Sequence, residues 1–363
     1  MPGSGKALAT SSRSGRPGLA LLLGCALFCC RETNPPSEPA SNSNANTGSA
    51  GRPLSVAILV PGSLSDAGWN YSAKEAADRI AAELEISPKV LDKIGASERK
   101  TVLRSLAREG TRLIICHGYE FNSTVRELAP QFPAVQFVVS GYDQPDPHFL
   151  SMVFDLSEAA YLCGVIAAVI SETGHAGFVS AQQTPPVALC YEGFRKGFLG
   201  VRPQGTVRPP VYIEGENPWE DAAAAKIKTQ TLLRADQPAP VDVLFQNTDT
   251  ASSGVFEAVS EASRKVFVFG ANRDQNENAT TDRVPASAVI RVDRAFLEVV
   301  REVRAGQSLS GVRRHNLRTG VVDCVLNRRL DRLVGAETAE RVRRAVAEAR
   351  AKITSGQVSS ESG

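Results

Sequence analysis

Short apolar runs alternate with stretches of helical spacing from residue 54 onward. The first run, Leu54–Val60, ends at a Pro-Gly pair, and a helical pattern then begins around 66–70 and continues toward Leu84. An apolar run, a loop of small polar residues and an amphipathic helix form the opening half of a βαβ unit. Because this order recurs along the chain, we predict an α/β protein.

Two consecutive series of strands and helices follow from this pattern. After the first run, strands are predicted at 89–93, 112–117, 134–140 and 149–155, and then at 176–180, 210–213, 241–246, 266–270, 285–292 and 320–326. Further helices are predicted at 98–109, 122–132, 157–171, 187–199, 219–233, 251–264, 293–305 and 337–353. Two series of similar size predict two doubly wound lobes with parallel sheets, and the cleft between such lobes is a preferred ligand site.

The segment 157–171 has the strongest helical pattern and is apolar on nearly all sides. It opens with Ser157 and carries Glu158 in its first turn, which is typical of a helix start. A helix that is apolar all round is buried, and this one is too short to cross a membrane. We therefore predict that it lies in the protein core.

The N-terminal residues have the pattern of an export signal rather than of a folded segment. Residues 1–24 combine basic residues with a short apolar core, and Cys25 follows Gly24, which resembles the lipobox of bacterial lipoproteins. We predict that Cys25 is lipidated; Cys30 is a second candidate, and a plain secretory signal is the alternative.

A polar segment separates this signal from the first strand. Residues 31–52 have almost no apolar side chains and are rich in Pro, Ser, Asn and Gly, so we predict a flexible tether over 25–52. Twenty or so such residues reach roughly 25 Å. The folded part is thus expected outside the cytoplasm, held at the membrane by a lipid, and a disordered tail is expected at 354–363.

The composition supports two packed lobes and gives no sign of a nucleic-acid partner or a cysteine metal site. The chain has 363 residues, 42% of them hydrophobic, and a formal net charge of +2, which gives no indication of a nucleic-acid partner. The cysteines beyond the signal region form no CxxC, so metal ligation is not expected. They are Cys116, Cys163, Cys190 and Cys324. Each lies in an apolar segment, which predicts free buried thiols, although the sequence leaves disulfide pairing open.

Motifs of common enzymes and cofactor sites are absent from the sequence. No GxGxxG follows a strand, the loop after the first strand lacks the Gly-Lys-Ser/Thr of a P-loop, and no GxSxG occurs. The four histidines show no metal-ligand spacing, and His117, at the end of a predicted strand, could face the cleft. We therefore expect a binding protein that is not an enzyme and uses no cofactor or metal.

Polar and aromatic side chains gather in the loops after the predicted strands, where open α/β sheets bind their ligands. The candidate binding residues are Asp66, Trp69, Asn70, Tyr119, Trp219, Asn247, Asp249, Asn272 and Asp274. The two tryptophans of the chain lie in strand-to-helix loops, one in each predicted lobe. A flat heterocycle between two such rings would gain about 0.5–1.5 kcal/mol per aromatic contact beyond its buried area. Asn and Asp side chains could read its ring nitrogens, amines or sugar hydroxyls.

A plainer interpretation explains some of the same residues. Asp66 is well placed to cap the helix that follows it, and Trp69 could simply pack in the core. Asn and Asp also favour caps and turns in general. Capping needs no tryptophan, however, so the set as a whole favours a ligand site.

Several longer spans carry a family resemblance. They are DAGWNYSAKEAADRI, FDLSEAAYLCGVIAAVISETGHAGFVS, GVFEAVSEA, VFVFGANRDQNENA and ASAVIRVDRAFLEVVREV. In combination they resemble the basic membrane protein family, whose members are lipoprotein substrate-binding components of ABC importers, similar to purine nucleoside receptors. The resemblance extends over about 54–326.

The resemblance implies a type I periplasmic-binding-protein fold, with two doubly wound parallel-sheet lobes joined by three crossover strands. The crossovers would fall near 154–156, 290–293 and 317–321. The N-terminal lobe would then comprise 53–155 with 293–317, and the C-terminal lobe 156–292 with 318–353.

The resemblance also implies roles for aromatic residues. Gly68-Trp69-Asn70 matches a Ser-Phe-Asn segment whose aromatic ring stacks on the base in the family. A second stacking aromatic, in a loop that ends in Asp, is similar to Trp219 with Asp221. These matches imply that a base lies between Trp69 and Trp219.

Two positions depart from the family pattern. The segment 270–275 matches a Gly-x-Asp-x-Asp-Gln turn, but Asn272 replaces its first Asp. A lysine carried by many members falls on Ile290, and the adjacent Arg291 should point to the opposite face of the strand. Because that Asp and Lys are credited with binding ribose, the departures imply a nucleobase, or a nucleoside held differently.

The leading hypothesis is a lipid-anchored receptor that delivers a purine-type ligand to an ABC permease, with ATP hydrolysis on a separate ATPase subunit. The alternatives are an anchored sensor of the same fold without transport, a non-purine ligand, and an extracytoplasmic nucleoside hydrolase. A transcriptional regulator is not expected, given the export signal and the absence of a helix-turn-helix pattern before Leu54.

Overall fold

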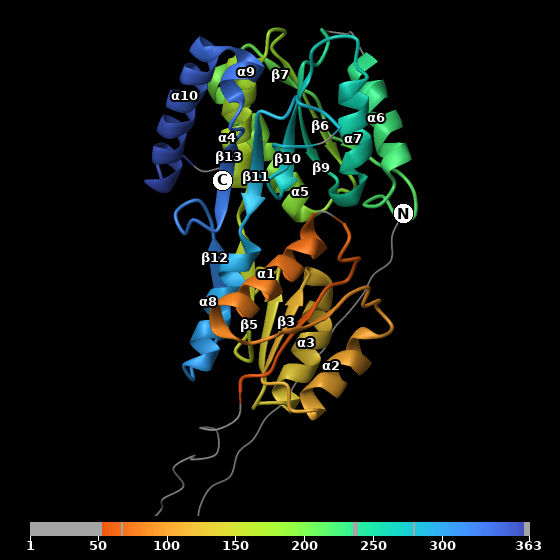
Figure 1. The fold of residues 1–363 in the computed structure, drawn as a ribbon, viewed down its shortest axis with the longest axis vertical. Helices are drawn as coiled ribbons and strands as arrows, with labels where there is room; N and C mark the ends of the chain where they lie inside the picture. Colours follow the sequence, from red (N-terminus) through yellow and green to blue (C-terminus); the bar gives the residue numbers. More distant parts are fainter. Residues whose placement is uncertain (1–52, 67, 235–238, 279, 359–363) are drawn as a thin grey trace, which may run out of the picture. The chain divides into compact units, whose positions relative to one another are not determined.

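The computed structural model describes residues 53–66, 68–234, 239–278 and 280–358, all within one compact unit, 52–363. The predicted lipidation site Cys25, the signal 1–24 and the tether over 25–52 lie outside the described residues. Two mainly parallel sheets with helices on both faces organise the described part (Figure 1). We call each sheet with its helices a lobe.

The first lobe contains a six-stranded sheet in the order β12-β5-β4-β3-β1-β2, and each of its pairings is parallel. Its strands are β1 (Val56–Leu59), β2 (Lys89–Leu91), β3 (Leu113–His117), β4 (Gln136–Ser140), β5 (Phe149–Phe154) and β12 (Gly311–His315). Its helices are α1 (Trp69–Leu84), α2 (Arg99–Arg108), α3 (Asn122–Leu128) and α8 (Val292–Arg304), with short 3-10 turns η1 (Tyr119–Phe121) and η2 (Ala129–Gln131).

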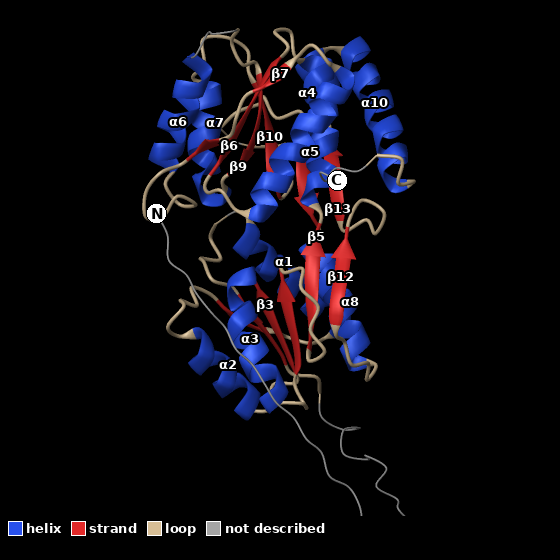
Figure 2. Ribbon diagram, turned by 180° about the vertical axis from the view of Figure 1, so that it is seen from behind, coloured by secondary structure: helices blue, strands red, loops and turns tan. Residues whose placement is uncertain are grey.

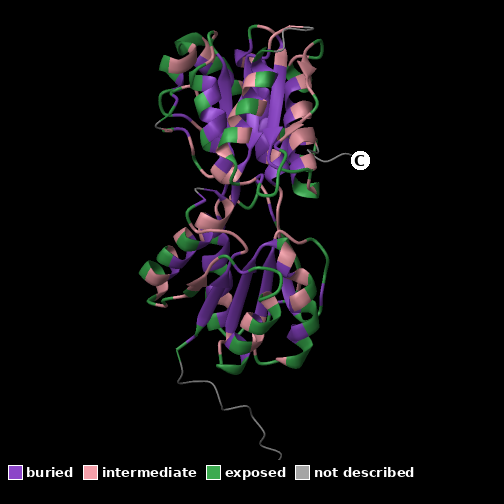
Figure 3. Ribbon diagram, turned by 90° about the vertical axis from the view of Figure 1, so that its right-hand side faces the viewer, coloured by how far each residue is buried: buried purple, intermediate pink, exposed green. Residues whose placement is uncertain are grey.

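Alternate residues along these strands face opposite helical layers. Ile58 and Ile115 pack in one cluster with buried residues of α1 and α8, whereas Leu59 and Cys116 pack in another with residues of α2 and α3. Both faces are therefore covered, which explains why consecutive residues of β1 and β3 are all apolar or buried. Figure 3 shows these strands as buried and the outer surfaces of the helices as exposed.

The second lobe contains a seven-stranded sheet in the order β13-β11-β10-β9-β6-β7, with β8 also paired to β6. Its strands are β6 (His175–Ser180), β7 (Thr206–Val207), β8 (Val211–Tyr212), β9 (Val243–Asn247), β10 (Phe267–Asn272), β11 (Ala286–Ile290) and β13 (Val322–Leu326). The pairing of β11 with β13 is antiparallel, and the others are parallel. The predicted parallel sheet is thus confirmed, and β13 adds one antiparallel strand at its edge.

Two helical layers cover the second sheet. On one face α6 (Ala222–Arg234) and α7 (Ser252–Ser260) share a buried cluster with the strands, next to the 3-10 turn η3 (Asp249–Ala251). The other face carries α4 (Leu156–Ile170), α5 (Pro185–Val201) and α10 (Ala336–Thr354), preceded by α9 (Leu330–Val334). Twelve of the 15 residues of α4 are buried, as its apolar pattern predicted.

The chain passes between the sheets three times. β5 leads through Asp155 into α4, β11 leads through Arg291 into α8, and β12 leads through 316–321 into β13. Backbone hydrogen bonds join these crossovers, since the N–H of Asp155 donates to the carbonyl of His315 at 2.8 Å. Figure 2 shows β5 and β12 side by side where they leave the first sheet.

Most predicted strands and helices are present within a few residues of their expected ends. The strand β12, the short strand β7 and the short helix α9 were not predicted. Among the described residues, no helix combines the length and the apolar character that a membrane span requires.

Candidate functional site

The loop between β1 and α1 is organised by the buried carboxylate of Asp66. Its two oxygens accept hydrogen bonds from the backbone N–H groups of Gly68, Asn70 and Tyr71 at 2.8–3.0 Å. The side-chain amide of Asn70 donates to the same carboxylate at 2.7 Å. Because N–H groups in the first turn of a helix have no partner within the helix, Asp66 caps α1, as the plainer interpretation suggested.

The indole ring of Trp69 lies flat against the imidazole ring of His117. Their centroids are 3.9 Å apart and their planes differ by 16°, and the ring of Phe154 meets the indole edge-on at 6.0 Å. Since one face of the indole rests on His117, its other face is the one that a flat ligand could cover.

His117 is a neutral support for this tryptophan. It is fully buried at the end of β3, and burial lowers its pKa to about 3. Its Nε2 lies 3.0 Å from the carbonyl oxygen of Trp69, and its Nδ1 lies 2.6 Å from the hydroxyl of Ser140. Because a carbonyl only accepts, Nε2 carries the proton and Nδ1 accepts from Ser140. His117 thus has a structural role here.

Three predicted residues of the second lobe lie together at the carboxyl ends of two neighbouring strands. Asn247 ends β9, Asn272 ends β10 and Asp249 opens η3. The amide nitrogen of Asn272 donates to Asp249 Oδ1 at 2.8 Å, and it lies 3.5 Å from Asn247 Oδ1. This amide therefore links the two loops.

These second-lobe residues contact the N-terminus of α1. The backbone N–H of Trp69 donates to Asp249 Oδ1 at 3.4 Å, and the hydroxyl of Thr250 donates to the carbonyl oxygen of Asp66 at 3.1 Å. A Cβ at Gly68 would lie 2.5 Å from Asp249 Oδ1, so a larger residue there would displace the Asp249 carboxylate. Asp249 thus completes, from the second lobe, the cap that Asp66 provides from the first.

A second contact between the lobes involves a cation. The guanidinium of Arg273, next to Asn272, donates from Nε and from a terminal nitrogen to the Glu75 carboxylate of α1 at 3.1 and 2.7 Å. The same guanidinium lies 4.4 Å from the centre of the Tyr71 ring. A bidentate ion pair with a cation–π contact favours the arrangement in which the two lobes meet.

Asp249 is the most perturbed carboxylate of this site. Burial, together with the nearby negative charge of Asp66, raises its pKa from 3.8 to about 7. The hydrogen bonds from Asn272 and from the Trp69 N–H act in the opposite direction, because they stabilise the charged form. The ionisation of Asp249 is therefore sensitive to whether the lobes are in contact.

The backbone has an unusual conformation at Asp249 and at Asn272. Asp249 has φ +46° and Asn272 has φ +65°, and among the described residues only Glu85 and Lys93 share a positive φ without being glycine. Asp and Asn tolerate this left-handed conformation better than most residues. Strained backbone of this kind gathers at ligand-binding and switch regions, which supports a functional reading of these loops.

Trp219 lies before α6 in the second lobe and is half-buried. Its indole Nε1 lies 3.4 Å from Gln182 Oε1, and its carbonyl oxygen accepts from the N–H of Ala251 at 3.0 Å. Among the described residues its ring makes no ring contact with Trp69, whose aromatic neighbours are His117 and Phe154.

The remaining predicted residues lie at the margin of this set. Tyr119 is 48% exposed in η1, and Asp274 is exposed and accepts from the N–H of Asn276 at 3.0 Å within its own turn. Ile290 is buried at the end of β11, where it pairs with Val322 of β13. The structure thus brings together Asp66, Trp69, Asn70, Asn247, Asp249 and Asn272, while Tyr119 and Asp274 take no part in these contacts.

Sequence reasoning missed Thr250, Arg273 and Gln182. Arg273 lay within a motif that was quoted for its neighbours, and a lone arginine in a polar loop gives no signal of a partner in another lobe. The hydrogen bond of Thr250 to the Asp66 carbonyl spans 184 residues, and such pairings follow only from the folded arrangement.

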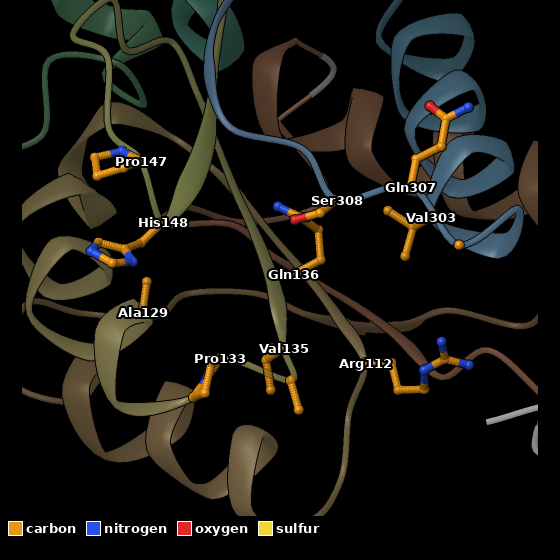
Figure 4. Close-up of a pocket in the computed structure, with 12 residues that line it drawn as sticks. Arg112, Ala129, Pro133, Val135, Gln136, Pro147, His148, Val303, Gln307 and Ser308 are labelled. Carbon is orange, nitrogen blue, oxygen red and sulfur yellow. The ribbon is translucent and has the colours of Figure 1, made fainter. Parts of the chain in front are cut away.

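A cavity of the first lobe lies away from these residues. It has a volume of about 310 Å³ and is lined by residues such as Arg112, Gln136, His148 and Gln307 (Figure 4). These residues precede β3, begin β4, precede β5 and follow α8, so the cavity lies at the amino ends of the strands. Ligands of open α/β sheets bind at the carboxyl ends of the strands, so this cavity lies at the edge opposite to the expected ligand site.

The side chains that could ligate a metal are not grouped in the described part of the chain. No group of three or more His, Cys, Asp or Glu side chains there is arranged to hold a metal ion. The thiols of Cys116, Cys163, Cys190 and Cys324 are free and buried, as predicted.

A family of transport proteins matches most of the chain. The family described as "ABC transporter substrate-binding protein PnrA-like" matches residues 54–358. The chain is 24% identical over 278 residues to basic membrane protein A1 of Borrelia garinii, covering 75% of this chain and 80% of that protein. It is 27% identical over 205 residues to a purine-binding protein of Brucella abortus, covering 55% of this chain and 56% of that protein.

Solved structures show the same fold. An ABC transporter solute-binding protein from Aeropyrum pernix superposes with a TM-score of 0.73 at 22% identity, over 85% of this chain and 93% of that one. A second, from Conexibacter woesei, gives a TM-score of 0.68 at 20% identity, over 85% and 98% of the two chains.

Proposed function

Because the chain belongs to the family of PnrA-like ABC transporter substrate-binding proteins, we propose that it binds a purine nucleoside or nucleobase between its two lobes. The fold is that of the type I periplasmic binding proteins. Such proteins close around their ligands by hinge motion. The purine-binding relative of Brucella abortus supports this class of ligand.

The observation that carries the proposal is the meeting of two loops from different lobes. The N-terminus of α1 presents Trp69, and the loops after β9 and β10 present Asp249 and Asn272 to it. Hydrogen-bonding groups and an aromatic face thus share one location, which suits a flat heterocycle with polar edges.

In the bound state we expect the base to lie between Trp69 and Trp219. One face of Trp69 is already covered by His117, which leaves a single face for the ligand. Asn70, Asn247, Asp249 and Asn272 would hydrogen-bond the edges of the base, and we assign Asp66 the supporting role of helix cap. Tyr119 and Asp274 are proposed as peripheral contacts only.

The ribose, if present, is held differently from the family pattern. Ile290 is apolar and buried, and Asn272 carries an amide where the family pattern has a carboxylate. The family pattern has a lysine and an aspartate at these two positions, and both are credited with binding ribose. Here an alkyl group and an amide take their places. This supports a nucleobase, or a nucleoside whose sugar is read by other groups.

We further propose that the protein is anchored outside the cytoplasm by a lipid on Cys25, with a tether over 25–52, and that it serves an ABC permease and its ATPase subunit. The sequence pattern before the first strand and the transporter family support this arrangement. The binding protein itself would perform no catalysis.

A ligand screen tests the binding proposal. The purified protein should be stabilised against thermal unfolding by purine bases or nucleosides, and not by sugars or amino acids. A ligand at 100 times its Kd adds roughly 2.7 kcal/mol of stability, an easily measured shift. The chain has only two tryptophans, so quenching of their fluorescence reports directly on the proposed site. Stabilisation by another class, with no purine response, would overturn the purine assignment.

The pKa of Asp249 gives a test of the loop contact. The folded protein holds this proton more tightly than the unfolded chain, because the pKa is raised from 3.8 to about 7. The stabilising contribution is fully present below about pH 4 and is lost as the pH rises through about 7. An amide in the Asp249→Asn variant keeps a hydrogen-bond acceptor but does not ionise. We therefore expect the melting temperature of the variant, minus that of the unmodified protein, to increase as the pH is raised from about 5 to about 8.

Other groups titrate in the opposite sense and cancel in this comparison. Burial lowers the pKa of His117 to about 3 and that of His315, with a contribution from Arg313, to about 4. Their contributions are present above about pH 6.5 and are lost as the pH falls, in both proteins alike. A melting-temperature difference that does not change with pH would contradict the assignment to Asp249.

A further inference from the structure

Two buried thiols of the second lobe lie close to each other. The Sγ atoms of Cys163 on α4 and Cys324 on β13 are 3.7 Å apart. Both side chains are buried, and α4 packs directly on β13 in one apolar cluster. The thiol of Cys190 is near enough to Cys163 to add to the rise of its pKa, but Cys324 is the partner in sulfur–sulfur contact with it.

We propose that Cys163 and Cys324 form a disulfide when the chain folds in an oxidising compartment. A disulfide has an S–S length of about 2.05 Å, so the sulfur atoms must approach by about 1.7 Å. Rotation of a cysteine side chain about its Cα–Cβ bond moves its sulfur by at least as much as this required approach. Helix α4 already packs directly on β13, so the approach asks only for small adjustments within that layer.

The chemistry is a thiol–disulfide exchange with a low-molecular-weight or protein disulfide. The thiolate of one cysteine attacks the partner disulfide, forming a mixed disulfide and releasing one partner thiol. The second cysteine then attacks the mixed disulfide and releases the other partner thiol. The pair loses two electrons and two protons, and the partner disulfide gains them.

The exchange belongs to the folding stage. Burial raises the pKa of the Cys163 thiol well above its usual range in the native protein, so the reactive thiolate is scarce there. In the unfolded or partly folded chain both thiols are exposed to an oxidant. Formation of the bond in the organism rests on the export proposed above. Formation of the bond in the purified protein can be tested without reference to ligand or location.

The bond would fix the second lobe where it meets the hinge. Helix α4 begins directly after the first crossover, and β13 begins directly after the third. A bond between them joins residues that are 161 positions apart in the chain. Crosslinks over long stretches of chain restrict the unfolded state most, so the lobe would gain stability and keep two hinge anchors in fixed relation.

Refolding of the full chain followed by thiol mapping tests the proposal. In this chain Cys25, Cys29 and Cys30 are replaced by serine, so that four thiols remain. It is refolded with a mixture of oxidised and reduced glutathione, blocked with N-ethylmaleimide under denaturing conditions, reduced, and labelled with iodoacetamide. Cleavage after Glu172 separates Cys163 from Cys190 for mass spectrometry.

We expect the second label on Cys163 and Cys324 and the first label on Cys116 and Cys190. In the Cys324→Ala variant, Cys163 should carry the first label, whereas Cys190→Ala should leave the Cys163–Cys324 bond intact. The oxidised protein should unfold about 5 °C above the same protein refolded with reductant. The first label on both Cys163 and Cys324, or a bond from Cys163 to Cys190, would overturn the proposal.

Discussion

Replacement of Gly197 by alanine is expected to lower the free energy of unfolding by about 3 kcal/mol or more and the melting temperature by about 5 °C or more. The cause is the close approach of α5 to α4. A Cβ at Gly197 would lie 2.0 Å from the carbonyl oxygen of Tyr161, and a Cβ at Gly193 would lie 2.2 Å from that of Ser157. Both obstacles are backbone atoms, so the helices would have to separate.

The approach is reciprocal, which increases the expected effect. A Cβ at Gly164 of α4 would lie 2.1 Å from the carbonyl oxygen of Phe194 on α5. Helix α4 also packs on α10, β11 and β13, so it has no free side toward which it could shift. Overpacking in such a layer is relieved only by moving elements that are themselves well packed.

Gly200→Ala is the matched control on the same helix. A Cβ there would meet only the hydroxyl of Tyr161, at an ordinary 3.5 Å. Alanine within a helix is favoured over glycine by up to about 1 kcal/mol, so this variant should be neutral or slightly more stable. Urea denaturation of both variants measures the difference. Equal stability of Gly197→Ala and Gly200→Ala would contradict the backbone contact.

These glycines illustrate what the sequence could and could not predict. The apolar pattern of 157–171 predicted a buried helix, because burial on all sides leaves a direct trace in composition. The partner of that helix and the separation of the two backbones leave no such trace. Gly193 and Gly197 gave no sequence signal, since glycine is also common in loops and turns.

The strand β12 shows a similar limit. Its sequence, GVRRH, is largely polar, and it was not predicted as a strand. Its extended form follows from parallel pairing with β5, more than 150 residues earlier in the chain. Arg313 pairs with Glu302 on one side and Arg314 with Asp155 on the other, so charged residues suit this edge position.

The sequence predicted which loops carry the candidate site residues, but it did not predict the contacts between those loops. The loops after β1, β9 and β10 were expected to hold polar residues near a ligand, because the carboxyl ends of parallel strands share one edge. The contact of Asp249 with the Trp69 N–H, and the raised pKa that follows from burial beside Asp66, depend on how two lobes meet. The spacing of residues along the sequence does not indicate how the two lobes contact each other.

Trp219→Ala is expected to weaken binding of the purine ligand about 30- to 1000-fold, which corresponds to about 2–4 kcal/mol. The substitution removes one of the two proposed stacking rings. Trp219 is the better of the two probes, because the Trp69 ring also packs on His117 and Phe154 and its loss would disturb the first lobe. The backbone contact of the Trp219 loop, from the N–H of Ala251 to its carbonyl oxygen, is kept in the variant.

Two further variants separate stacking from other effects. Trp219→Phe keeps an aromatic face and should lose much less affinity than the alanine variant. Gln182→Ala removes the neighbour of the indole Nε1 and should change the affinity little, since the ring itself remains. Calorimetric titration of each variant with the best ligand of the screen gives the Kd values, and thermal unfolding without ligand shows whether each fold is intact.

The pattern among the variants decides between the ring and its surroundings. If Trp219→Ala binds as tightly as the unmodified protein, the base does not stack on this ring, and the ligand is held by the first lobe and the Asn247–Asp249–Asn272 set alone. If Gln182→Ala loses as much affinity as Trp219→Ala, the orientation of the indole matters as well as its presence. Loss confined to Trp219→Ala, with Trp69 as the single remaining fluorophore still quenched at high ligand concentration, is the result that a base held between the two rings requires.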